Sequence, residues 1–407
     1  MRRFRILLAL MALMALTAGA ENKNYITRVL DYSPAPGQFI NTTPQYVEGE
    51  PLDSLLARVL WNITGRYIYE TYEMLDGTVW VDSTFSVQPG LISLGGYGGS
   101  VTFGFDHPVV NVPDALDLQI FGNAFTQTGS ATAGSSEPGI VMVSRDVNGN
   151  GLADDPWYEL AGSEYGSKST YHHYEITYYR PDEGHVPVPQ NPFFTDTQHI
   201  RWTAVNHDLG TTSEGYIAQN SFHKQSYWPQ WVDEPTITIS GALLPENFED
   251  DGSGQNFVQD FKGWGYVDNR PDYNYEEALT DSISEICNMG FDIGWAVDEQ
   301  GQRVKLPYID FVKVYTALNQ QLGWIGETST EVKGAIDLHP DEPLPVEHKR
   351  GDVNDDGDVD AIDLNIMINI LLGADVADNY GGRADVNGDG TPDGNDLNDI
   401  INIILGK

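Results

Sequence analysis

The chain has 407 residues, of which 60 are acidic and 22 are basic, and its formal net charge is −38. Such an excess of negative charge argues against nucleic acid and anionic membranes as partners, because both would repel the protein. The single cysteine, Cys287, excludes an internal disulfide, so stability must come from a packed core or from bound ions.

The first twenty residues predict a secretory signal peptide. Arginines occupy positions 2, 3 and 5, an apolar run covers 6–16, and small residues fill 18–20. This order of a positive, an apolar and a small-residue segment is typical of a peptide that is removed on export. We expect cleavage after Ala20. The apolar run is too short to span a bilayer and no later run is long enough, so no membrane insertion is expected.

Residues 21–338 predict a body made mainly of β-strands. Short segments rich in β-branched and aromatic residues alternate with Gly, Pro, Asn and Asp. The candidate strands are 100–105, 116–121, 139–144, 157–160, 174–179, 200–204, 236–240 and 309–316. Helical signals are few, and 277–289 is the best of them. Many strands without βαβ alternation predict an antiparallel β-sandwich.

Part of this body resembles a family of secreted bacterial cell-surface proteins. The resemblance lies in GGYGGSVTFGFDHPVVNVPDALDLQIFGNAF at 95–125, in SSEPGIVMVSRDVNGNGLADDPWYELAGS at 135–163 and in the closing strand IDFVKVY at 309–315. It implies a jelly-roll, galactose-binding-like sandwich with no assigned function. Residues 165–285 would then be a large insertion or additional strands.

A twelve-residue segment between two candidate strands has the spacing of a calcium loop. Its predicted ligands are the side chains of Asp146, Asn148, Asn150 and Asp154 and the carbonyl of Leu152, with Asp155 as a further donor. Loop position 12 is Trp157, so the usual terminal carboxylate is absent there. The alternative is a plain Asn/Gly turn, which needs no ion.

The segment 222–231 (FHKQSYWPQW) concentrates aromatic side chains among polar ones. A glycan presents apolar C–H faces that stack on exposed rings, so Tyr227, Trp228 and Trp231 are the predicted ligand-binding residues. The alternative, which a β-rich chain favours, is that these rings belong to the core.

Catalytic motifs do not stand out. The sequence has no HExxH motif, Cys/His cluster, GxSxG elbow or P-loop. His172 and His173 would point to opposite faces of a strand, so a zinc site is not expected. With 60 carboxylates, an acid/base pair for glycoside hydrolysis can be neither assigned nor excluded.

Residues 339–350 contain three prolines and no hydrophobic periodicity, which predicts a semi-extended linker. Beyond it, DVNDDGDVDAID at 352–363 is repeated as DVNGDGTPDGND at 385–396, an offset of 33 residues. Both loops have acidic or amide residues at positions 1, 3, 5, 9 and 12 and Gly at position 6. Calcium takes six to eight oxygen ligands, and the glycine turn lets one loop surround it. An acidic, solvated tail is the alternative, but it gives no reason for a repeat.

Two calcium ions are predicted here. The ligands of the first loop are the side chains of Asp352, Asn354, Asp356, Asp360 and Asp363 and the carbonyl of Asp358. Those of the second are the side chains of Asp385, Asn387, Asp389, Asp393 and Asp396 and the carbonyl of Thr391.

An amphipathic helical pattern follows each loop, whereas prolines precede the first and Gly381-Gly382 the second, so an entering helix is missing. Residues 351–407 thus resemble a type I dockerin. The resemblance implies an all-α module that binds a cohesin domain in a calcium-dependent way. In that family loop positions 10 and 11 help to select the partner; here they are Ala361, Ile362, Gly394 and Asn395. The two pairs differ chemically, which argues against the near-symmetric double binding mode of some dockerins.

The fold class expected is mainly β, an antiparallel sandwich or jelly-roll body with a small all-α calcium-loop module. The leading functional hypothesis is an exported, non-catalytic protein at the cell surface or in a complex, whose body binds a glycan. The alternatives are a polysaccharide-degrading enzyme, since dockerins are most often appended to such enzymes, and a structural adhesin.

Overall fold

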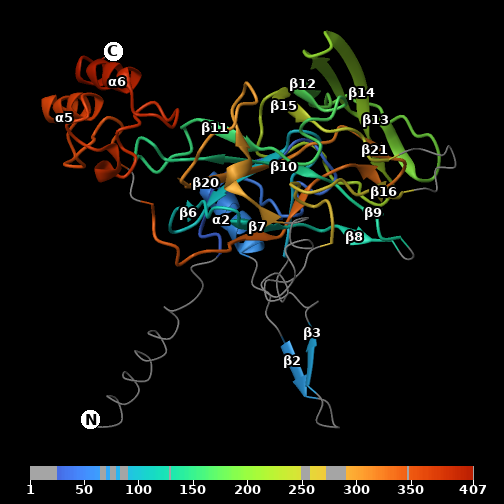
Figure 1. Cartoon of the computed structure of the whole chain (residues 1–407). Coiled ribbons are helices and arrows are strands. Elements are labelled where there is room, and N and C mark those ends of the chain that lie inside the picture. The colour runs from blue at the N-terminus through green and yellow to red at the C-terminus, as the bar shows by residue number, and fades with distance from the viewer. Residues whose placement is uncertain are drawn as a thin grey trace. The chain divides into compact units, whose positions relative to one another are not determined.

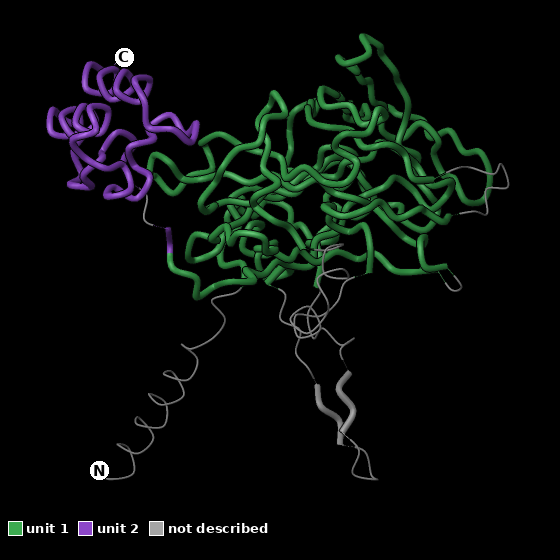
Figure 2. The backbone as a smooth tube through the Cα atoms, viewed as in Figure 1, with its two compact units in different colours: residues 1–343 green, residues 344–407 purple. Residues whose placement is uncertain are grey.

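The computed structural model describes residues 25–64, 70–73, 79–82, 90–127, 130–248, 257–271, 290–345 and 348–406. The chain divides into two compact units, Met1–Pro343 and Leu344–Lys407, which are described separately (Figure 2). The expected signal peptide, Cys287 and the candidate helix at 277–289 lie outside the described residues. Over the described residues, no helix combines the length and the apolar character needed to cross a bilayer.

The first unit is built on a β-sandwich (Figure 1). One sheet has the antiparallel order β1 (Arg28–Ser33), β5 (Ser100–Gly104), β20 (Phe311–Thr316), β10 (Gly139–Ser144), β11 (Trp157–Leu160) and β18 (Ala296–Val297). A smaller antiparallel sheet has the order β17 (Gly290–Phe291), β7 (Leu118–Phe121) and β24 (Gly334–Asp337). Both sheets contribute to one core. The six-stranded sheet supplies Val101, Val141 and Val312, and the three-stranded sheet supplies Leu118 and Ile120. The predicted fold class is confirmed.

Helix α2 (Leu52–Ile63) was not expected from the sequence, whose best helical signal was at 277–289. Leu55, Val59 and Ile63 recur every four residues and are buried in the sandwich core. Pro51 precedes the helix, where its missing N–H costs no hydrogen bond. This apolar spacing is helical and was present in the sequence.

A separate four-stranded sheet, which we call the second sheet, lies within residues 165–285. Its antiparallel order is β14 (Thr211–Asn220), β13 (Phe194–Asn206), β12 (Tyr171–Tyr179) and β15 (Thr236–Leu243). It has its own core, which includes Ile176, Tyr178, Ile200 and Ile217. The pairing of β13 with β14 is irregular between Phe194 and Ile200, which marks a bulge.

Short strands complete the first unit. They are the pairs β4 (Ile92–Ser93) with β23 (Glu331–Val332), β6 (Val109–Val110) with β19 (Tyr308–Ile309), β21 (Gln321–Leu322) with β22 (Gly326–Glu327) and β2 (Glu70–Glu73) with β3 (Val79–Asp82), and the group β8 (Phe125–Thr126), β9 (Ala133–Ser135) and β16 (Gln259–Asp260). The one-turn helix η1 (Ile293–Trp295) precedes β18.

The second unit contains α5 (Ala361–Leu371), the short helix η2 (Ala377–Tyr380) and α6 (Gly394–Ile404) (Figure 1). Met367 of α5 and Ile400 of α6 are fully buried and share a core with Val353 and Val386, one residue from each acidic loop. The apolar stripes predicted from the sequence therefore pack on one another, and the loops are part of the same core.

Candidate functional site

The first acidic loop of the C-terminal unit is held by its own backbone. The side chain of Asp352 is buried, and its two oxygens accept the N–H groups of Asp356 (3.1 Å) and Gly357 (2.7 Å). Asn354 Oδ1 also accepts the N–H of Asp356, at 3.1 Å. Gly357 has φ +92°, a conformation that side chains disfavour, which explains glycine at position 6.

Asp363 closes this loop onto the following helix. Its fully buried carboxylate accepts the N–H of Val353 at 2.7 Å and the N–H of Asp360 at 2.9 Å. Asp360 in turn accepts the N–H of Ile362 at 2.6 Å and also that of Asp363, which completes a capping box. Helix α5 begins here because the loop satisfies its first N–H groups.

The second loop repeats these contacts. Asp385 accepts the N–H groups of Asp389 (3.1 Å) and Gly390 (2.8 Å). Asp396, also fully buried, accepts those of Asn387 (2.9 Å) and Asp393 (2.7 Å). Gly390 has φ +89°, close to the value at the same position of the first loop. The duplication in sequence is therefore a duplication in structure.

Two arginines cross-link the repeats. Arg350 Nε donates to the carbonyl of Val386 at 2.8 Å, and Arg383 Nε donates to the carbonyl of Val353 at 3.1 Å. Each arginine stands two residues before one loop and contacts position 2 of the other, so the two contacts are related by the same offset as the loops. This pair was not expected from the sequence, although the two arginines are 33 residues apart, like the loops.

The loops offer only hard oxygen donors, which suits calcium. The pKa of the exposed Asp356 carboxyl is lowered by hydrogen bonds from the N–H of Asp358 and the amide of Asn354, so it is ionised at neutral pH. Carboxylates packed this closely repel one another unless a cation neutralises them.

Two helices, each entered through an acidic twelve-residue loop and packed on a shared core, define the class of calcium-loop docking modules. Residues 350–405 match the family model described as Dockerin type I domain. The chain therefore carries a type I dockerin domain at its C-terminal end, as the resemblance predicted. Such domains bind calcium and cohesin domains, and the proteins that carry them are typically extracellular and attached to cell surfaces. Comparison with curated proteins found no significant match.

The loop at 146–155 in the body has the same internal bonding. The oxygens of Asp146 accept the N–H groups of Asn150 (3.0 Å) and Gly151 (2.7 Å). Asp155, at position 10, accepts the N–H of Val147 at 3.0 Å. This is the bond that position 12 makes in the first C-terminal loop, so Asp155 replaces the carboxylate that the sequence lacks at Trp157. The amide of Asn150 donates to Asp154, and this hydrogen bond lowers the pKa of the Asp154 carboxyl.

The aromatic segment 222–231 does not present an open surface. Tyr227 is 0% and Trp228 3% exposed, and both belong to the core of the second sheet. Trp231 is half-buried and stacks on Tyr32, with ring centroids 5.8 Å apart. Tyr227 and Trp228 are therefore core residues, as the alternative interpretation of this segment had it. Burying their rings against the sheet removes apolar surface from water, which is favourable.

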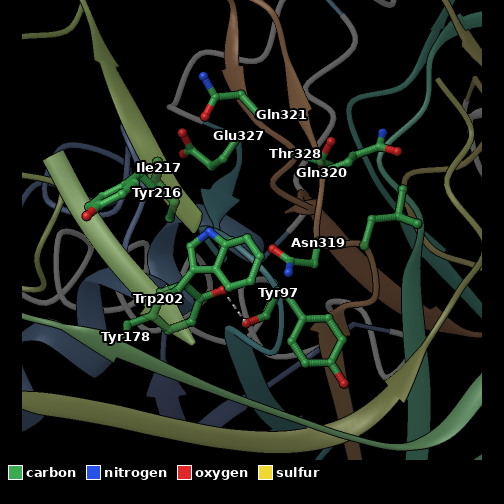
Figure 3. A pocket seen from close by; sticks show the side chains of 12 residues that line it. Tyr97, Tyr178, Trp202, Tyr216, Ile217, Asn319, Gln320, Gln321, Glu327 and Thr328 are labelled. Carbon is green, nitrogen blue, oxygen red and sulfur yellow. Dashed lines mark hydrogen bonds between the residues drawn. The ribbon is translucent and has the colours of Figure 1, made fainter. Parts of the chain in front are cut away.

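A cavity of about 70 Å³ lies instead between β13, β14 and the segment 318–328 (Figure 3). Its lining residues include Trp202, whose ring faces it, and Tyr216, Asn319 and Gln321. The indole of Trp202 lies over Gly215 on the neighbouring strand, where a Cβ would come within 2.5 Å of the ring. Tyr216 is 41% exposed. Nothing in the local sequence pattern indicated this wall.

The same cavity contains polar atoms without a partner among the described residues. Glu327 is 4% exposed; its Oε1 accepts the N–H of Gln38 at 2.7 Å, whereas its Oε2 has no partner. The neighbouring Thr328 Oγ1, also buried, has none either. Burial raises the pKa of Glu327 to about 7. Buried polar atoms that lack a partner are costly, so a polar ligand or water would stabilise this site.

A group of buried carboxylates lies elsewhere in the body. One oxygen each from Glu137, Asp268 and Glu331 lies within 4.8 Å of the others. Burial raises the pKa of Glu137 to about 7 and raises the pKa values of Asp268 and Glu331 well above their ordinary range, and mutual repulsion adds to the shift. Asp268 accepts the N–H of Glu331 at 2.9 Å, which ties the group to the backbone.

Proposed function

We propose that this chain is an exported, non-catalytic protein that is docked to a cohesin-bearing surface or complex and binds an extracellular glycan with its body. The observation that carries the docking is the repeated loop, in which N–H groups hold the carboxylates at positions 1 and 12. The domain organisation proposed is a signal peptide at 1–20, a body at 21–338, a linker at 339–350 and the docking domain at 351–407.

Each docking loop binds one calcium ion in this proposal. The ligands of the first ion are Asp352, Asn354, Asp356, the carbonyl of Asp358, Asp360 and Asp363; those of the second are Asp385, Asn387, Asp389, the carbonyl of Thr391, Asp393 and Asp396. Because these donors are charged and crowded, ion binding contributes directly to the folding of the unit.

A third ion is proposed at the body loop, with Asp146, Asn148, Asn150, the carbonyl of Leu152 and Asp154 as ligands. Support comes from the bonding that this loop shares with the docking loops. The loop joins two paired strands, β10 and β11, so an ion there would stabilise the hairpin and take no part in docking.

The partner contacts the first turns of the two helices in this proposal. Ala361, Ile362, Gly394 and Asn395 are all exposed. Ile362 is 53% exposed and so offers the partner an apolar side chain. The corresponding residue of the second repeat, Asn395, is polar, so one repeat offers an apolar contact and the other a hydrogen-bonding one.

Binding of the full-length protein to a panel of cohesin domains tests the docking, with calcium and with EDTA. We expect binding to at least one cohesin in calcium and its loss in EDTA, together with loss of amide protection over 351–406. Ile362→Asn should weaken binding at least tenfold, whereas Leu209→Asn, an equally exposed leucine of the body, should not. Binding that survives EDTA would contradict calcium-dependent docking.

The lining of the cavity supports glycan binding. A sugar ring stacks on an indole face, as Trp202 offers, and its hydroxyls bond to amides and carboxylates. Asn319 and Gln321 supply the amides, and Glu327 supplies an oxygen that needs a donor. One or two sugar hydroxyls would satisfy the unpaired atoms of this wall.

Screening the full-length protein against a glycan library tests the body. We expect retention without products, and Trp202→Ala should reduce retention at least tenfold. Trp61→Ala, which removes a 61% exposed indole from α2, is the matched control. Product release would favour the polysaccharide-degrading enzyme, with Glu327 as one of the two carboxylates that hydrolysis needs. Neither retention nor products would favour the structural adhesin.

A further inference from the structure

Two residues of β13, Asp196 and His199, and one residue of the loop between β12 and β13, His185, converge on one point beside the bulge in β13. His185 Nε2 lies 2.5 Å and His199 Nδ1 3.3 Å from the same oxygen, Asp196 Oδ2. One ligand atom from each of the three residues lies within 4.8 Å of the others. The group was not expected from the sequence, in which the histidines match no metal-binding motif.

The fold explains why these residues meet. The register of β13 against β14 shifts on both sides of Asp196, so this residue leaves the regular alternation of the strand and its side chain is 1% exposed. Its Oδ1 accepts the N–H groups of Val188 and Gln198, both at 3.0 Å. These bonds fix the carboxylate, and its second oxygen faces the two rings.

We propose that His185, Asp196 and His199 bind one divalent transition-metal ion of the zinc class. Two imidazole nitrogens and one carboxylate oxygen are a ligand set typical of zinc, whereas calcium prefers oxygen donors alone. The site is therefore chemically distinct from the three calcium loops. The ligands are His185 Nε2, Asp196 Oδ2 and His199 Nδ1, and the ion takes the place of the protons that the imidazoles otherwise share with the carboxylate.

The surroundings of His199 suit a metal ligand. Coordination through Nδ1 places the remaining ring proton on Nε2, which lies 3.5 Å from the side-chain amide of Gln219. The ring is also packed edge-on against Tyr227, with centroids 5.1 Å apart, which fixes its orientation.

The site is reachable from solvent. The side chains of His185 and His199 are 27% and 16% exposed, so an ion can enter and at least one coordination position remains for water or a ligand group. The pair of His173 and Asp208 differs from this site. Their side chains are 2.6 Å apart, but that of His173 is 62% exposed, and among the described residues no second histidine joins the pair to form a metal-binding group.

Metal titration of the calcium-saturated full-length protein tests this site. We expect one equivalent of Zn²⁺ by calorimetry and, with Co²⁺, a visible absorption band typical of low-coordinate nitrogen and oxygen ligation. His185→Ala and His199→Ala should each weaken Zn²⁺ binding at least 100-fold. His173→Ala, the matched control from the exposed pair, should bind like the unsubstituted protein.

Two results would overturn the assignment: no Zn²⁺ uptake at micromolar concentrations, or uptake that both histidine variants retain. Tryptophan fluorescence of each variant shows whether its body is folded, because all nine tryptophans lie before residue 344. A folded His185→Ala variant that binds Zn²⁺ normally would show that the three residues form only a hydrogen-bonded group.

Discussion

Asp356 of the C-terminal unit is exposed and accepts the N–H of Asp358, whereas Glu137, Asp268 and Glu331 of the body lie against one another, the last two buried. The pKa of Asp356 is lowered by this bond, and that of Glu137 is raised by burial. The same side-chain chemistry thus serves two purposes. The loop carboxylates stay charged, and their oxygens surround the space where a cation would bind. The three carboxylic acids of the body favour the protonated form because they lie inside a core.

The body loop at 146–155 shows that the loop arrangement does not depend on the docking domain. It lies between β-strands and not before a helix, yet Asp146 makes the same two backbone contacts as Asp352 and Asp385. Only the closure differs: Asp155 closes the body loop from position 10, and Asp363 closes the docking loop from within a helix. Local spacing decides the bonding inside the loop, and the element that follows decides how it closes.

The largest expected effect is on the docking loop. Asp352→Ala removes a charged ligand and two hydrogen-bond acceptors, so calcium affinity should fall by about 100-fold or more, equivalent to about 3 kcal/mol. Amide exchange over 351–406 in millimolar calcium is the measurement. Asp358→Ala is the matched control, because that position contributes only its carbonyl. Equal protection in the two variants would rule out the ligand role of Asp352.

The next effect concerns pH. Because burial raises the pKa of Glu137 to about 7, the folded body favours the protonated acid, and its stability is highest below the unfolded pKa. Stability should then decline by about 3 kcal/mol as the pH rises from about 5 to about 8. Other buried acids whose pKa values burial raises to about 7 act in the same direction: Asp117, Glu159 and Glu327.

Urea unfolding followed by tryptophan fluorescence measures this decline. Glu137→Gln should remove the part of this decline that Glu137 contributes, and Glu183→Gln, an exposed control, should leave the decline unchanged. A body that becomes more stable between pH 5 and 8 would mean that the buried acids are ionised and neutralised by another group.

A smaller effect is expected at the body loop. Asp155→Ala removes the closing bond to Val147, so the calcium-induced rise in the melting temperature of the body should shrink by about 2–4 °C. Fluorescence melts with calcium and with EDTA report this difference, and Asp233→Ala serves as an exposed control. If calcium does not change the melting temperature of the unsubstituted body, the segment is a plain turn.

The smallest effect distinguishes the two docking loops. Position 4 is Asp355 with φ +63° in the first loop and Gly388 with φ +76° in the second. Asp355→Gly relieves this conformation but loses the exposed ion pair with His348, so a net gain of about 0.5 kcal/mol is expected. Gly388→Asp should lose about 1 kcal/mol. Circular dichroism melts of the two variants in calcium test whether these changes have opposite signs.

The sequence predicted the strands at 139–144 and 157–160 residue for residue, because both are short runs of β-branched or aromatic residues between turn signals. It failed at α2, where Leu55, Val59 and Ile63 point into a core that the neighbouring sheets complete. For Tyr227 and Trp228 it favoured burial but left ligand binding open, since ring exposure depends on which strands pack above them.

By itself, the sequence determined the docking loops and the helices that follow them, because each decisive bond, such as that from Val353 to Asp363, joins residues of the same twelve. Tertiary structure alone decided the rest. Arg350 meets Val386, Glu137 meets Asp268, and His185 and His199 meet Asp196 only after the chain has packed and β13 has bulged. These contacts depend on long-range register, which no short-range spacing encodes.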